Sequence, residues 1–139
     1  MLRTELLHPE ILGALGTSGH GSKVLIADGN YPFATGSNKS AKKVYLNLSP
    51  GIVTVPQVLA AVNESIVVEA AAVMEPNTGE EPPIFEDFRN ILECTEFEKK
   101  GRFEFYEAAK EDSVSLVIAT GEERTYANIL LTVGVVEPE

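Results

Sequence analysis

The chain has 139 residues, of which 44% are hydrophobic, and its 21 acidic and 11 basic side chains give it a net charge of −10. This length fits a single domain over residues 1–139 with one sizeable core, and this composition excludes a disordered chain. No apolar run reaches the ~18 residues of a membrane span, and the acidic balance argues against a nucleic-acid partner, because phosphate backbones bind basic surfaces.

The first half of the chain predicts a helix followed by a strand. Pro9 stands at a suitable first helical position, apolar residues at 11, 12 and 15 share one face, and Gly16 and Gly19 end the helix. The run KVLIAD, residues 23–28, is typical of a short strand buried on both faces. After it we expect a loop over 29–43, a strand over 43–48, a helix over 54–65 and a strand over 66–74.

The second half continues the alternation of helices and strands. A turn-rich connection over 75–83 precedes helices over 84–94 and 102–112 and apolar strands over 114–122 and 128–136. In the helix over 102–112 we expect Phe103, Tyr106 and Ala109 to share a side. Alternating elements predict an α/β fold: three layers, with a mainly parallel sheet and helices on both of its faces.

The predicted compartment is the cytoplasm. The N-terminal stretch MLRTELLHPEIL contains acidic residues and lacks the apolar core and cleavage site of a signal peptide. The one cysteine, Cys94, has no partner for an internal disulfide, as is usual in a reducing compartment. We expect it to pack as a small hydrophobic side chain rather than to act as a nucleophile.

Polar residues stand at the ends of two predicted strands. Asp28 closes the first of them, and Tyr126, Ala127 and Asn128 stand just before the last. Open α/β sheets bind ligands beyond the carboxyl ends of their strands, so the loops after Asp28 and Gly121 are expected to converge on one site. Tyr126 and Asn128 offer the hydroxyl and amide hydrogen bonds that sugars need. Alternatively, Asp28 caps a turn and Asn128 satisfies backbone groups at a strand start.

His20 stands between two glycines in the GHG of residues 19–21. Imidazole titrates near neutral pH, so His20 is a candidate acid and base, and the glycines let the backbone approach a ligand. Asp28 is then a candidate either to orient this imidazole or to bind a substrate hydroxyl. The plainer interpretation is a histidine that caps a turn. His8, before a proline, is expected to be solvated or to stand at the helix entry.

The sequence lacks the motifs of several other chemistries. It has no GxxxxGK[ST] phosphate loop, no GxGxxG after a strand and no GxSxG nucleophile elbow. Two histidines without clustered cysteines do not favour a zinc site. We therefore expect proton transfer on a neutral small molecule, with no metal, no cofactor and no covalent intermediate.

The chain resembles the RbsD/FucU family of sugar mutarotases and pyranases in three stretches: LHPEILGALGTSGHGSKVLIADGNYP, RFEFYEAAK and ATGEERTYANILLTVGV. The resemblance covers essentially the whole chain. It implies an RbsD-like fold and a cytoplasmic isomerase that interconverts the cyclic forms of a free monosaccharide. It also implies a ring-shaped homo-oligomer, commonly a decamer, with sites near subunit interfaces. By residue match, His20 looks like the proton donor, and Asp28, Tyr126, Ala127 and Asn128 look like substrate ligands.

The stretch RFEFYEAAK is similar to the fucose-mutarotase branch, in which an arginine precedes FxFYE, whereas ribose pyranases tend to have a histidine in this region. The resemblance therefore implies that Arg102 is a substrate ligand and that the sugar is L-fucose, with D-ribose pyranase as the alternative. Ser22 stands where an acidic residue is common after GHG, which keeps open a non-catalytic monosaccharide-binding protein associated with sugar transport. Arg102 could equally start a helix and face solvent.

Overall fold

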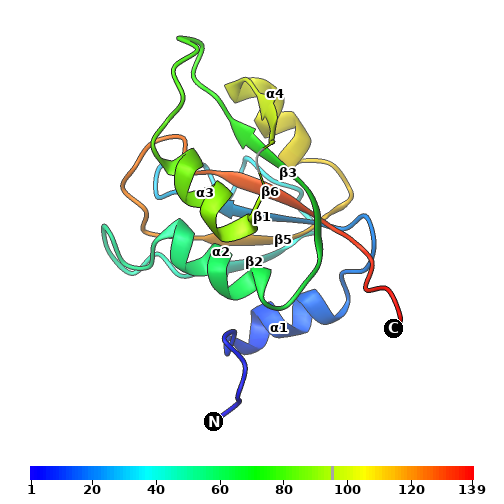
Figure 1. The fold of residues 1–139 in the computed structure, drawn as a ribbon. Helices are drawn as coiled ribbons and strands as arrows, with labels where there is room; N and C mark the ends of the chain where they lie inside the picture. Colours follow the sequence, from blue (N-terminus) through cyan, green and yellow to red (C-terminus); the bar gives the residue numbers. More distant parts are fainter. Residues whose placement is uncertain (95) are drawn as a thin grey trace.

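The computed structural model of the protein, which describes residues 1–94 and 96–139, is built of helices interspersed with strands (Figure 1). The described elements are, in order, α1 (Pro9–Gly16), β1 (Lys23–Ala27), β2 (Lys42–Tyr45), α2 (Val55–Asn63), β3 (Val68–Met74), α3 (Ile84–Leu92), β4 (Glu98–Lys100), α4 (Arg102–Ala109), β5 (Val114–Ala119) and β6 (Ile129–Val133). All are expected from the sequence except β4, whose residues are all charged. This strand lies at the sheet edge, where charged residues are common and no apolar pattern is required.

The strands form one six-stranded sheet in the order β2-β5-β1-β6-β3-β4. The pairs β2–β5, β5–β1 and β3–β4 are parallel, and β6 is antiparallel to both of its neighbours. Five strands therefore point the same way, which confirms a mainly parallel sheet. The carboxyl ends of these five strands share one edge with the amino end of β6, so the loops after β1 and β5 meet the loop that enters β6.

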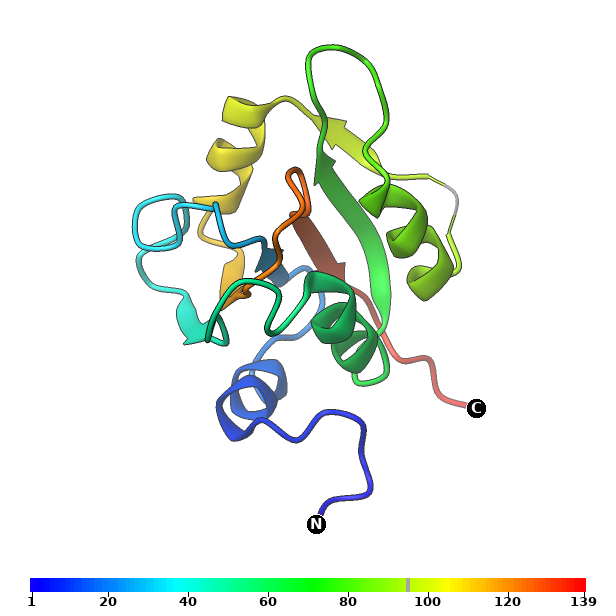
Figure 2. The same ribbon diagram turned by 90° about the vertical axis from the view of Figure 1, so that its left-hand side faces the viewer.

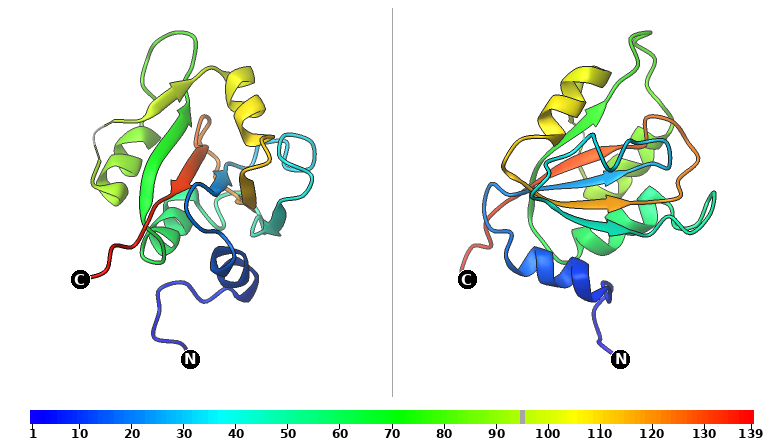
Figure 3. Two further views of the ribbon diagram at one scale, coloured as in Figure 1. Left: turned by 90° about the vertical axis from the view of Figure 1, so that its right-hand side faces the viewer. Right: turned by 180° about the vertical axis from the view of Figure 1, so that it is seen from behind.

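Helices cover both faces of the sheet, as expected. Helices α1, α2 and α3 pack on one face, and α4 with the loop after β1 packs on the other (Figure 2; Figure 3, right). Along β1, Val24 and Ile26 face the first layer, whereas Leu25 and Ala27 face the second. This alternation explains why the strand reads as an uninterrupted apolar run, since both of its faces are buried.

Two helices begin with side chains that satisfy free backbone N–H groups. At α2, Thr54 accepts from the N–H of Gln57, and the Gln57 side chain accepts from the N–H of Thr54, which is a capping box. At α1, Nδ1 of His8 accepts from the N–H of Glu10 at 3.2 Å. His8 therefore stands at the helix entry, in agreement with the second of its two sequence interpretations.

Of the three residues of α4 expected to share a side, Ala109 is buried and Tyr106 is partly buried, whereas Phe103 is exposed. Phe105, Ala108 and Ala109 face the core, and Phe103 is 76% exposed. Phe103 and Tyr106 do lie together, with ring centroids 6.2 Å apart, and Tyr106 packs against the core cluster that contains Phe105. Aromatic residues at positions 103, 105 and 106 give this short helix two apolar sides, and only packing against the sheet decides which one is buried.

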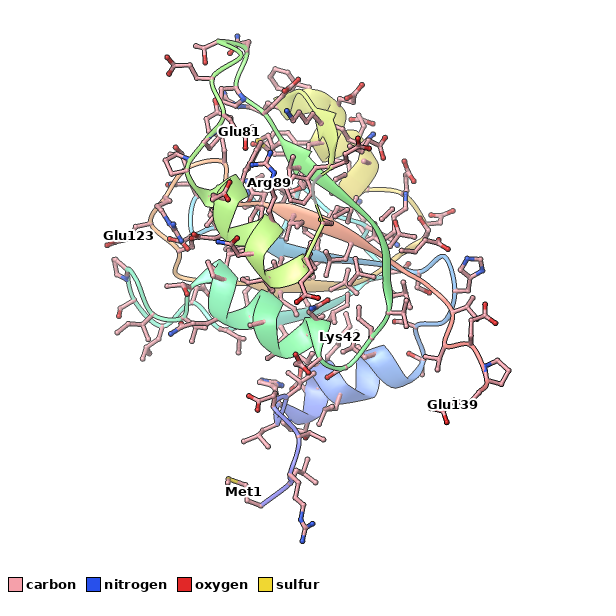
Figure 4. All side chains as sticks on the ribbon, viewed as in Figure 1. Met1, Lys42, Glu81, Arg89, Glu123 and Glu139 are labelled. Carbon is pink, nitrogen blue, oxygen red and sulfur yellow. The ribbon has the colours of Figure 1, made fainter. Side chains whose placement is uncertain are left out.

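Two ion pairs join neighbouring segments, and Figure 4 labels Glu81, Arg89 and Lys42 among their residues. Arg89 of α3 binds Glu81, which holds the connection over residues 75–83 against that helix. Lys42 of β2 pairs with Glu10 of α1 at 3.0 Å. Within the described residues, no helix has the length and apolar character needed to cross a membrane.

Candidate active site

A cavity of about 370 Å³ opens at the sheet edge that carries the ends of β1 and β3 and the start of β6. Asp28, Arg102, Tyr126 and Asn128, which the sequence singles out, all line it. A second cavity of similar volume lies along the same edge, beside residues 47–50 and 120–123. We assign the site to the first cavity, because it gathers hydrogen-bonding side chains from β1, α4 and the loop into β6.

Asp28 is a buried carboxylate on the lining of this cavity. Its carboxylate accepts from the N–H of Asn30 at 3.0 Å and from the N–H of Ala127 at 3.2 Å. Its own N–H donates to Oδ1 of Asn128 at 2.8 Å. These bonds join the end of β1 to the start of β6, so two segments that are 100 residues apart are held in one arrangement.

Burial is the main influence on the pKa of Asp28, which is 3% exposed. Desolvation raises the pKa of this carboxyl above its ordinary value of 3.8, and hydrogen bonds from Asn30, Ala127 and Asn128 oppose the shift without cancelling it. An ionised, poorly hydrated carboxylate is a strong hydrogen-bond acceptor, which is the property needed to bind a neutral polyhydroxylated ligand.

Arg102 and Tyr126 also line this cavity. Arg102 is the first residue of α4, and its Nη2 donates to the Tyr126 hydroxyl at 3.3 Å. Tyr126 has a positive φ of 58°, which is uncommon for a residue other than glycine and is often found at functional sites. Arg102 is an exposed residue on the lining of the cavity, and its guanidinium retains N–H groups for a ligand.

The loop that carries Tyr126 is held by an ion pair between a buried carboxylate and a partly exposed guanidinium. Glu122 is 5% exposed and accepts from Nη2 of Arg124 at 3.1 Å, and Nη1 of Arg124 also reaches Asp87 of α3 at 2.8 Å. Burial acts to raise the pKa of Glu122, but the bonds from Arg124 outweigh it and hold that pKa below its usual range. The loop into β6 is therefore tied to the helical layer as well as to β1.

Sequence reasoning did not select several residues that line the cavity: Asn30, Tyr31, Met74, Tyr106 and Thr125. Tyr106 had a usable signal, because it stands four positions after Arg102 and so shares its face of α4. Tyr31 supports Tyr106 edge-to-face, with ring centroids 5.4 Å apart. Met74 ends β3, and its position became evident only from the strand order.

Ala127 contributes through its backbone N–H, which binds Asp28, while its side chain is fully buried. Among residues 1–94 and 96–139, no group of three or more His, Cys, Asp or Glu side chains is arranged to hold a metal ion.

His20 lies at the other end of the sheet. His20 precedes β1, and Asp28 follows β1. The five residues of this strand, at ~3.3 Å each, therefore separate His20 from Asp28 by roughly 17 Å. In Figure 1 the segment 17–22 lies at the right-hand end of β1, and the loop 120–128 lies at the left. Asp28 therefore does not orient the imidazole of its own chain. Instead, His20 Nε2 lies 3.0 Å from Oε1 of Glu69.

The fold and the cavity define a small α/β protein with a cavity lined by polar side chains at the edge of a mixed sheet. The sequence model of the RbsD / FucU transport protein family matches residues 1–136, and the chain belongs to this family. It is 34% identical to fucose mutarotase from Homo sapiens, over 94% of this chain and 90% of that protein. It is 31% identical to D-ribose pyranase from Bacillus cytotoxicus, over 98% and 99% of the two chains.

Two solved structures place the fold in the same group. Bacillus subtilis RbsD complexed with D-ribose superposes with a TM-score of 0.84 and 26% identity, over 99% of this chain and 100% of that chain. The fucose mutarotase from Streptococcus pneumoniae, in complex with L-fucose, gives a TM-score of 0.83 and 28% identity over the same fractions.

Proposed function

We propose that this protein is a cytoplasmic mutarotase that interconverts the anomers of a free aldose, with L-fucose as its preferred sugar. The observation that carries the proposal is the gathering of a buried carboxylate, Asp28, a guanidinium, Arg102, and a phenol, Tyr126, around one cavity. These groups present hydrogen-bond acceptors and donors to a ring of hydroxyls. Relatives named fucose mutarotase and D-ribose pyranase support the same class of substrate.

The chemistry follows from the hemiacetal. Ring opening removes a proton from the anomeric hydroxyl and delivers one to the ring oxygen, and reclosure on the other face of the carbonyl exchanges the anomers. Closure through a different hydroxyl changes the ring size, which is the pyranase reaction. General acid–base assistance by a positioned group contributes ~10²–10⁴-fold. This chain needs one group that transfers protons and several that hold the sugar.

His20 is the proposed proton donor, delivered to the cavity by a neighbouring subunit. The cavity of the same chain lies at the opposite end of β1 from His20. The His20 side chain is 61% exposed and is therefore accessible to a second chain. Phe103, which follows Arg102 in α4, is 76% exposed, and Leu48 is 81% exposed. A contact between subunits would cover both of these side chains. We propose a homo-oligomer, a decamer, with composite sites.

L-fucose rather than D-ribose is favoured by Arg102. Its place on the cavity wall supports a ligand role over the alternative of a helix-start arginine that faces solvent. D-ribose pyranase stays as the second candidate, because the relatives include enzymes of that name. A non-catalytic sugar-binding protein is the third.

Saturation-transfer NMR on L-fucose, D-ribose and D-galactose tests the proposal. We expect faster exchange between α and β anomers than in buffer alone, greatest for L-fucose, and slow exchange with His20→Ala. Sugar binding without any acceleration would assign the protein to the non-catalytic class, and acceleration confined to ribose ring forms would make it a pyranase.

Composite sites are tested by mixing two inactive variants. His20→Ala and Asp28→Ala subunits, co-assembled, each supply what the other lacks, so part of the exchange activity should return. No recovery in confirmed mixed oligomers would show that His20 and Asp28 act from the same chain or that His20 does not act.

A further inference from the structure

His20 is paired with a carboxylate from another strand. Its Nε2 lies 3.0 Å from Oε1 of Glu69, which is 49 residues further along the chain. A carboxylate only accepts hydrogen bonds, so this contact places a proton on Nε2 in the neutral imidazole. The lone pair, and with it the capacity to exchange a proton with a substrate, is then on Nδ1.

A β-bulge sets the direction of Glu69. The register of β3 against β6 runs from Val68 opposite Val133 to Ala70 opposite Thr132, so Glu69 is an extra residue on β3 with no counterpart on β6. Bulges of this kind re-aim a side chain and are over-represented next to active sites. Here the extra residue is the one that meets the imidazole.

The bulge is accommodated by a glycine. The N–H of Gly134 donates to the carbonyl of Val67 at 2.7 Å, and a Cβ at Gly134 would approach Cγ1 of Val67 to 2.9 Å and Cβ of Glu69 to 3.1 Å. Any larger residue at 134 would push these side chains away. The close packing of β6 on the bulge therefore depends on the absence of a side chain at this position.

The turn that carries His20 is anchored to the same place. The N–H of Gly21 donates to the carbonyl of Val133 at 2.9 Å, and the N–H of Val133 donates to the carbonyl of Ser22 at 2.8 Å. Gly21 has a φ of 87°, which lets the chain turn back onto β6. Val133 is thus bonded to the turn of His20 and stands opposite the residue before Glu69, so it fixes the two side chains relative to each other.

Stability does not account for this arrangement. The side chains of His20 and Glu69 are 61% and 47% exposed, and ion pairs at such exposure contribute little to folding. The bulge at Glu69, the close packing at Gly134 and the hydrogen bonds of Val133 nevertheless combine to fix this one contact. The contact is made to His20, the side chain to which we assign proton transfer.

We propose that Glu69 is a positioning residue for His20: it holds the imidazole through Nε2–H and presents Nδ1 to the cavity of the neighbouring subunit. This inference rests on the proposed role of His20. Glu69 does not touch the sugar, so its contribution is to the rate of proton transfer and not to sugar affinity.

The test compares Glu69→Ala and Glu69→Gln with the matched control Glu111→Ala. Glu111 is another exposed carboxylate in an ion pair, with Lys23 at 3.2 Å, and it lies near the same end of β1. At saturating L-fucose, we expect Glu69→Ala to lower the anomer exchange rate roughly tenfold, a part of the ~10²–10⁴-fold that acid–base catalysis contributes, with unchanged sugar affinity. Glu69→Gln, which keeps an acceptor for Nε2–H, should restore part of the rate, and Glu111→Ala should match the wild type.

Nitrogen-15 NMR of the imidazole supplies a readout that is independent of activity. The wild type should show the Nε2–H tautomer of His20, and Glu69→Ala should show a mixture of tautomers. Both the rate loss and the tautomer change are required, so the absence of either overturns the proposal. If His20→Ala keeps the wild-type rate, the proposed function loses its proton donor, and the tautomer still decides whether Glu69 orients the ring.

Discussion

The hydroxyl of Tyr126 accepts a hydrogen bond from Nη2 of Arg102 at 3.3 Å, and this contact joins the loop into β6 to the first turn of α4. The next residue in the loop, Ala127, donates its N–H to Asp28. The three side chains expected to bind the sugar are therefore connected through two neighbouring residues of one loop. A disturbance of that loop should alter affinity even when every sugar-binding side chain is still present.

Replacing Arg102 with alanine is expected to weaken L-fucose binding by ~1.5–3 kcal/mol, because a charge-assisted hydrogen bond is lost. Arg102→Lys should recover only part of the affinity, since an ammonium group does not reproduce the planar fork of a guanidinium. Isothermal titration calorimetry measures the change, and Arg3→Ala, in the exposed N-terminal segment, is the control. An unchanged affinity in Arg102→Ala would show that Arg102 faces solvent and does not bind the sugar. The reason for proposing L-fucose rather than D-ribose would then be lost.

Sugar affinity should fall on acidification at a higher pH than an ordinary aspartate would produce. The pKa of Asp28 is raised above 3.8 by burial, so protonation, which removes an acceptor, occurs as the pH falls through that raised value. Binding isotherms between pH 7 and pH 4 should show the loss in the wild type. Asp28→Asn should bind weakly at every pH in this range. Wild-type affinity that stays constant down to pH 4 would contradict the proposed role of the ionised carboxylate.

Removing Arg124 should destabilise the fold and weaken sugar binding together. Arg124→Ala leaves the buried Glu122 without its main donor, and we expect a loss of about 1–3 kcal/mol of unfolding free energy, at the lower end because Arg124 is partly exposed to water. Chemical denaturation measures it. Adding Glu122→Gln to this variant should recover part of the loss, because position 122 then carries no buried charge.

The pH dependence of this ion pair has a defined sign. The pKa of Glu122 is lowered on folding, so its contribution to stability is present above the unfolded pKa and is lost as the pH falls through the folded pKa. The difference in stability between the wild type and Arg124→Ala should therefore shrink on acidification. A difference that grows instead would show that another group dominates.

Gly121 is expected to tolerate no side chain. A Cβ at this position would collide with the carbonyl oxygens of Ser49 and Ile52, which are backbone atoms with little freedom to move. Gly121→Ala should lower the unfolding free energy by about 1–3 kcal/mol, as overpacking does. Gly13→Ala is the control, because nothing lies within 4 Å of a Cβ there and alanine favours a helix. Equal stabilities of the two variants would contradict this packing.

Much of the fold was predictable because its signals are local. The apolar run of β1, the capping box of α2 and the proline at the start of α1 each depend on a few neighbouring residues. The meeting of Asp28 with Ala127 and Asn128 was also predictable, since strand ends in a mainly parallel sheet share an edge. Charged β4 carried no such signal.

The sequence by itself determined which residues are chemically suited to bind a sugar and to transfer a proton, because residue type and strand position are properties of the chain. Only the tertiary structure decided that Arg102 faces the cavity, that Phe105 rather than Phe103 is buried and that Glu69 meets His20. These outcomes depend on strand order, on the bulge in β3 and on the packing of α4. Each of these positions is decided by how segments that are distant in the sequence pack together, and a local sequence pattern does not contain that information.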